Sequence, residues 1–130
     1  MQAGIPKLML GTSPFIGAAQ FGRKAYGYRK LFFHNESNMK RLFIKSATLG
    51  VKAVQLIVYE PLVNALREAE KEIGEHFFIA ATIMGGRKFE HDLNLIKPLQ
   101  PEIIALHALF CDALEDMIVG WMYLYSYPLF

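Results

Sequence analysis

The sequence predicts an α/β protein with a four-stranded parallel sheet, arranged as a (βα)4 half of a TIM barrel or, alternatively, as a small open α/β sheet. Apolar runs typical of buried strands begin near residues 51, 77 and 103, at intervals of 26 residues, and a further run lies near the start of the chain. Amphipathic segments separate these runs. Regular alternation of strands and helices indicates parallel strands joined by right-handed crossovers.

Composition narrows the class further. A chain of 130 residues, 53% of them hydrophobic, has room for one domain with a core, and we expect some of its apolar surface to lie in an interface. The net charge of +2 is too small to indicate a nucleic-acid partner. One cysteine excludes an internal disulfide, and the lack of a signal-peptide pattern predicts a cytoplasmic protein. Residues 117–130 form an apolar aromatic tail of 14 residues, too short to span a membrane.

The first expected strand covers residues 7–13 and runs into a Gly-Thr-Ser-Pro turn. Pro14 has no amide hydrogen to give to a sheet, so the strand ends before it. Residues 14–37 are then the longest segment without a clear helix or strand pattern, and they are rich in basic and aromatic side chains. We expect a long loop here, which either covers a ligand or packs its aromatic rings over one end of the domain.

The other strands are expected at 51–59, 77–84 and 103–109. The helices are expected at 38–49, 61–73, 89–96 and 113–125. Asn35, Ser37 or Asn38 caps the first of these helices, while Gly50 and Gly74 suit left-handed helix ends. The Gly-Gly-Arg-Lys segment at 85–88 is either a plain turn or a loop that holds an anion by its backbone amides.

Alternation along the strand at 51–59 favours the barrel over the open sheet. Val54, Leu56 and Val58 form an apolar side that suits a helix-covered outer face. The opposite side contains Gln55 and ends on Tyr59, which suits a barrel interior with polar groups towards its top. A complete barrel needs about 250 residues, so the chain corresponds to half of one.

Three segments resemble the first half of the aldo/keto reductase-type barrels: LGTSPFIG at 10–17, a helix that ends in ATLG at 47–50, and EIIALH at 102–107. The resemblance implies a barrel fold with Tyr59 and His107 at catalytic positions. Val54 stands where that family has its aspartate, and the Thr-Ile-Met tripeptide at 82–84 offers no lysine. The reductase chemistry is therefore not expected, because nothing would lower the pKa of the tyrosine.

Barrel enzymes carry their active groups at the carboxyl ends of the strands. On this basis His107 and Tyr59 are candidate catalytic residues. Ser13, Gln55, Thr82 and Asp112 are candidate substrate-binding residues. The competing interpretation of His107 is a structural histidine in the core. The competing interpretation of Asp112 is a cap of the following helix. No spacing indicates a metal site, and the sequence does not identify a cofactor.

Two functional classes remain open. The first is an uncharacterised TIM-barrel-like protein with a small-molecule or anionic ligand at the strand ends. The second is a non-catalytic oligomeric module, or a truncated remnant of a longer barrel enzyme. In either case we expect the chain to pair with itself as a homodimer or higher oligomer, because four strands leave open edges and an uncovered sheet face. Folding of the tail over that face within one chain is the alternative.

Overall fold

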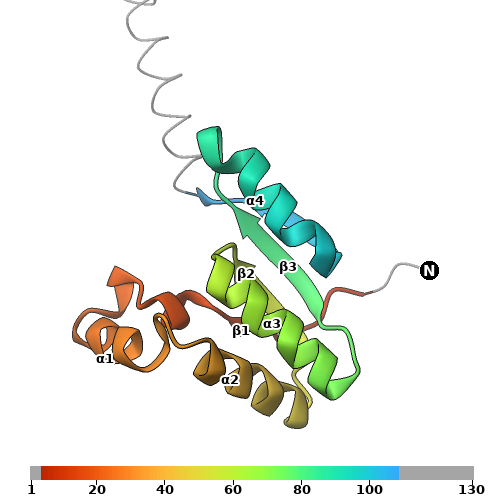
Figure 1. The fold of residues 1–130 in the computed structure, drawn as a ribbon, viewed down its shortest axis with the longest axis horizontal. Coiled ribbons are helices and arrows are strands. Elements are labelled where there is room, and N and C mark those ends of the chain that lie inside the picture. The colour runs from red at the N-terminus through yellow and green to blue at the C-terminus, as the bar shows by residue number, and fades with distance from the viewer. Residues whose placement is uncertain (1–3, 109–130) are drawn as a thin grey trace, which may run out of the picture.

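Four apolar segments pair in one sheet in the computed structural model of the chain, which describes residues 4–108 (Figure 1). The strands are β1 (Leu10–Gly11), β2 (Ala53–Ile57), β3 (Phe78–Ile83) and β4 (Ile103–Leu106). Their order in the sheet is β1-β2-β3-β4, and every neighbouring pair is parallel. The prediction of a parallel four-stranded α/β protein is confirmed for this part of the chain. The alternative prediction, a small open sheet, fits this arrangement.

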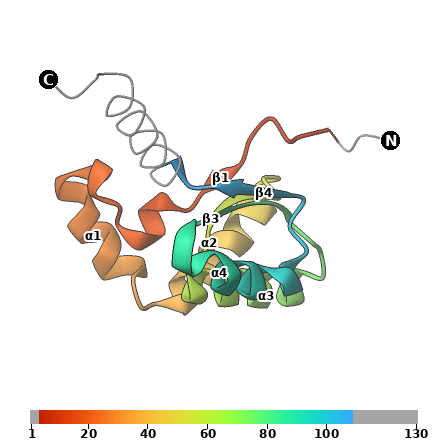
Figure 2. The same cartoon turned by 90° about the horizontal axis from the view of Figure 1, so that it is seen from above.

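Three helices cover one face of the sheet: α2 (Glu36–Thr48), α3 (Glu60–Ile73) and α4 (Phe89–Ile96). Figure 2 shows them together beneath the strands. The side chains of Val54, Leu56 and Ile79 point to this side and are fully buried. The predicted outer side of β2 is therefore the helix-covered side.

The ends of α2 and α3 follow the predicted signals. The amide of Asn38 donates to Oδ1 of Asn35, at 3.1 Å, which caps α2. Gly50, just after α2, and Gly74, at the end of α3, have positive φ angles of 85° and 70°. Glycine adopts this left-handed conformation without the steric cost that a side chain brings, so it ends a helix cleanly.

The expected loop at 14–37 is largely helical, which corrects the prediction. It contains two short 3₁₀ helices, η1 (Ser13–Ile16) and η2 (Ala19–Phe21), the ten-residue helix α1 (Arg23–Phe32) and the start of α2. Among the residues of α1, only Ala25 is buried. A helix that buries so little has no long apolar stripe, which is why the sequence pattern did not indicate it.

Tertiary contacts hold α1 and η1 to the domain. The ring of Phe15, in η1, lies 5.0 Å from that of Phe32, in α1, and 5.3 Å from that of Phe43, in α2. Nε of Arg29 donates to the backbone oxygen of Gly17 at 3.1 Å. An aromatic cluster of this kind buries a large apolar area, and it joins three helices to one core.

Strand β1 is two residues long, shorter than the predicted 7–13. Thr12 continues its pairing through the side chain. The hydroxyl of Thr12 accepts from the amide of Ile57 at 2.9 Å and donates to the carbonyl of Gln55 at 3.0 Å. The side chain thus supplies the donor and the acceptor that backbone groups of a longer strand would supply. Thr12 is fully buried.

The predicted helix at 113–125 and the tail at 117–130 lie outside the described residues, as do Leu109 and Cys111. Within residues 4–108, no helix is long and apolar enough to cross a membrane.

Candidate functional site

The sheet face opposite the helices carries the candidate site. Register places Gln55 beside Ala80, and Ile57 beside Thr82, so these four side chains share that face. Ala105 pairs with Thr82 and extends the face onto β4. The other side chains of this face are apolar, so Gln55 and Thr82 are its two polar groups within the described strands.

Gln55 and Thr82 are joined by a hydrogen bond. Nε2 of Gln55 donates to Oγ1 of Thr82 over 2.6 Å, from the middle of β2 to the carboxyl end of β3. Both residues are partly buried. The structure therefore brings together two of the residues that the sequence predicts to bind a substrate.

This pair has hydrogen-bonding capacity left over. An amide group has two donors and one acceptor, and a hydroxyl group has one donor and accepts as well. Within the described part of the chain, Oε1 of Gln55 accepts no hydrogen bond. The pair can therefore offer an acceptor and at least one donor to a neutral polar group, such as a hydroxyl or an amide. Neither side chain carries a charge.

Ser13 lies at the same edge of the sheet but in a different local setting. It is the first residue of η1, it is partly buried, and its carbonyl accepts from the amide of Ala18 at 3.2 Å. The adjacent Thr12 is committed to the pairing of β1 and β2. Of these two hydroxyl residues, Ser13 is therefore the one whose side chain makes no hydrogen bond to the described strands.

Tyr59 lies just beyond β2, at the N-terminal cap of α3. Its ring stacks on that of Phe33, with centroids 5.5 Å apart and planes 1° from parallel. Burial, with a smaller contribution from the charge of Glu36, raises the pKa of Tyr59 above its ordinary value. A raised pKa makes the phenol a weaker proton donor.

His107 directly follows β4, at the same end of the sheet. Its amide donates to the carbonyl of Ile83 at 2.9 Å, so the backbone is tied to β3 at this point. The side chain is partly buried. The proximity of His107 to Tyr59 or Gln55 stays a prediction. Asp112 lies outside the described residues.

A buried carboxylate near this edge was missed by the sequence reasoning. Asp92, in α4, is 4% exposed, and its Oδ2 accepts from the amide of Met84 at 3.0 Å, just after β3. An acidic residue on the same stripe as Phe89 and Ile96 was the available signal. This contact ties the start of α4 to the end of β3.

Comparisons of the chain with protein-family models, curated proteins and solved structures gave no match. The resemblance to the aldo/keto reductase-type barrels therefore rests on the quoted residues alone.

Proposed function

We propose that the chain is a half barrel that binds a small, neutral polar molecule at the carboxyl ends of its strands, and that its open sheet face closes against a second copy. The observation that carries the proposal is the hydrogen-bonded pair of Gln55 and Thr82, on the face that no described helix covers. Burying a polar side chain without a hydrogen-bond partner costs free energy. Polar side chains on an otherwise apolar face are therefore expected where a ligand supplies that partner.

The strand order supports the half barrel. The strands follow one another in chain order, and α2, α3 and α4 lie on one side. A doubly wound open sheet reverses its strand order and carries helices on both faces, whereas a barrel keeps chain order and places all its helices outside. The arrangement in residues 4–108 is the one that a barrel needs.

The side chains of the open face support pairing with a second copy. No helix within residues 4–108 covers this face, on which Ala105 is exposed and Ile57, Phe78 and Ala80 are partly buried. Alternation along β2 also places Ala53 on this side, but Ala53 is 2% exposed and adds no open surface. Apolar surface of this kind favours burial by about 25 cal/mol per Å². A two-fold axis through the face would bring two four-stranded sheets together and cover both.

Binding is favoured over proton transfer. The two residues that carry the site, Gln55 and Thr82, do not titrate in the physiological range. Their amide and hydroxyl groups orient a ligand by hydrogen bonds. We include Ser13 and His107 in the site because both lie at the same strand ends.

Thermal unfolding in the presence of neutral polyols, sugars and amides tests the ligand site. A bound ligand raises the unfolding temperature, and we expect Gln55→Ala and Thr82→Val to abolish the rise. Asn94→Ala and Thr48→Val are the controls, since both residues are exposed and lie within the helices α4 and α2. If no compound shifts the wild-type chain, or if the control variants lose the shift equally, the site is wrong.

A further inference from the structure

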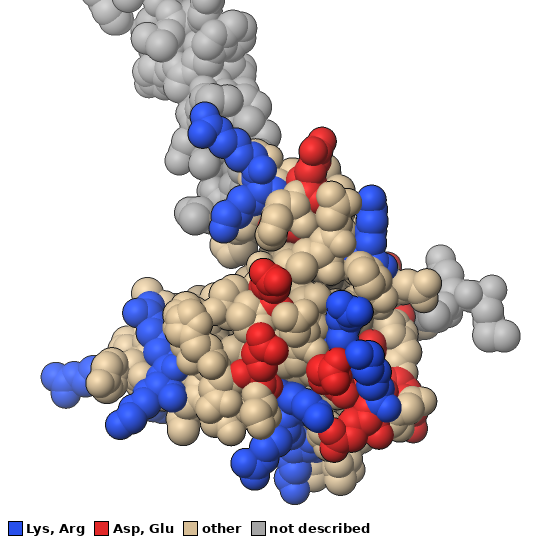
Figure 3. All heavy atoms as spheres, in the orientation of Figure 1, with Lys and Arg blue, Asp and Glu red and all other residues tan. Residues whose placement is uncertain are grey.

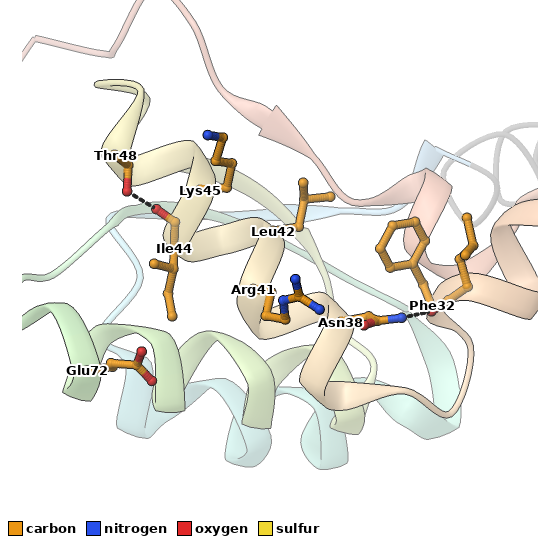
Figure 4. Close-up of a pocket in the computed structure, with 9 residues that line it drawn as sticks. Phe32, Asn38, Arg41, Leu42, Ile44, Lys45, Thr48 and Glu72 are labelled. Atoms are coloured by element: carbon orange, nitrogen blue, oxygen red, sulfur yellow. Dashed lines mark hydrogen bonds between the residues drawn. The ribbon is translucent and has the colours of Figure 1, made fainter.

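We propose a second binding surface, independent of the strand ends: a groove along α1 and α2 that docks an acidic amphipathic segment of a partner protein. The groove has a volume of about 660 Å³ and is open to solvent. Figure 4 shows its lining. The lining residues come from α1, α2 and α3, and they are Leu31, Phe32, Asn38, Arg41, Leu42, Ile44, Lys45, Thr48 and Glu72.

Most polar groups of the groove are already bonded. The side-chain amide of Asn38 donates to the carbonyl of Leu31 at 2.8 Å, and the hydroxyl of Thr48 donates to the carbonyl of Ile44 at 2.9 Å. Glu72 is paired with Lys40. These contacts leave the groove walls with an apolar character between the two helices.

Arg41 and Lys45 are the exceptions. They stand four residues apart on α2, so they are neighbours along one face of the helix. Both are exposed, and within residues 4–108 neither side chain forms a hydrogen bond or an ion pair. An apolar groove with two unpaired cations at its edge is complementary to a ligand with an apolar side and carboxylates at matching spacing.

The charge around the groove extends this complementarity. Residues 1–48 contain eight lysines and arginines and a single acidic residue, Glu36. Figure 3 shows the basic side chains over α1 without acidic ones among them. Such a surface draws an acidic partner towards the groove and speeds its association.

Shape and composition favour a protein segment as the occupant. The surface is concave, so it receives side chains that project from a helix, as helix-in-groove complexes do. Among the described residues, α3 is the most acidic helix that a second copy could offer, and it is a poor occupant. The apolar residues of α3, such as Leu62 and Leu66, are fully buried in the chain's own core. That helix has no apolar side to offer.

Fluorescence anisotropy with the full chain tests the proposal. The probe is a labelled synthetic helical peptide of about 15 residues, with leucines on one side and glutamates elsewhere. We expect Arg41→Glu combined with Lys45→Glu to weaken binding by at least about tenfold. The control pair, Arg87→Glu with Lys88→Glu, makes the same charge change on the exposed 3₁₀ helix η3 (Gly86–Lys88), and it should leave binding nearly unchanged.

Two further arms address the groove itself. Leu31→Ala should weaken binding because Leu31 lines the groove, whereas Leu8→Ala should not; the two leucines are 53% and 66% exposed, so neither variant disturbs the core. A scrambled peptide of the same composition should bind weakly. Equal losses in both double variants, or equal binding of the scrambled peptide, would overturn the proposal. Binding to vesicles rich in phosphatidylserine, with no peptide binding, would do so as well.

Discussion

Replacing Thr12 by valine removes the hydroxyl that joins β1 to β2 while keeping the shape of the side chain. Two hydrogen bonds are lost, to the carbonyl of Gln55 and from the amide of Ile57. Thr12 is fully buried, so water cannot replace these bonds easily. A buried polar group left without a partner costs about 1 to 3 kcal/mol, and the two groups together should cost about 2 to 4 kcal/mol of folding free energy.

Thr12→Ser is the matched control, because serine keeps the hydroxyl and loses only a methyl group. Its cost should be about 1 kcal/mol, the value of a buried methylene-sized group. Urea unfolding followed by circular dichroism, at a fixed protein concentration, compares the three proteins. If valine destabilises the chain no more than serine does, the hydroxyl does not extend the sheet, and the structural role assigned to Thr12 is wrong.

Three further predictions concern single side chains. Gly27→Ala, inside α1, should stabilise the chain by up to about 1 kcal/mol, because an added Cβ meets nothing within 4 Å. Gly74→Ala should instead destabilise it by about 1 kcal/mol, because φ is 70° there. Thermal unfolding measures both changes, and a shift of the same sign in both variants would contradict this assignment. The raised pKa of Tyr59 stabilises the folded state below the ordinary tyrosine pKa of 10.0, and this stability is lost as the pH rises through the folded-state pKa. Tyr59→Phe should therefore flatten the fall of the unfolding free energy above pH 10.0. Identical pH profiles for the two proteins would refute the contribution of Tyr59. Glu102→Ala should cost about 1 to 2 kcal/mol in urea unfolding, because Oε2 accepts from a strand amide at 2.6 Å, and an equal cost for the exposed Glu90→Ala would count against that contact.

The sheet and three of its helices could be predicted because their signals are local. Apolar runs of strand length, a cap at Asn35 and glycines at 50 and 74 each report on a few neighbouring residues. Helix α1 could not be predicted in this way. It has a glycine in its interior, and the contacts that hold it, from Phe15 and from Gly17 to Arg29, come from outside the helix. Tertiary contacts override weak local preference here.

The candidate site was predictable only in part. Alternation along β2 shows that Gln55 and Val54 face opposite ways, and that is visible in the sequence. The pairing of Gln55 with Thr82 depends on the register between β2 and β3, where a shift by one residue would place them on opposite faces. The role of Thr12 was missed for a related reason. A strand predicted over residues 7–13 needs no side chain to complete its pairing, whereas the two-residue β1 does.

The molecular mass in solution, measured by light scattering at low micromolar concentration, tests the proposed half barrel most directly. We predict a mass near twice 14.8 kDa for the wild-type chain. Ala80→Glu places a charge in the middle of the open face, away from the helix-covered core, and should return the mass to 14.8 kDa while the far-ultraviolet circular dichroism stays the same. A stable mass of 14.8 kDa for the wild-type chain would contradict closure of the sheet face by a second copy.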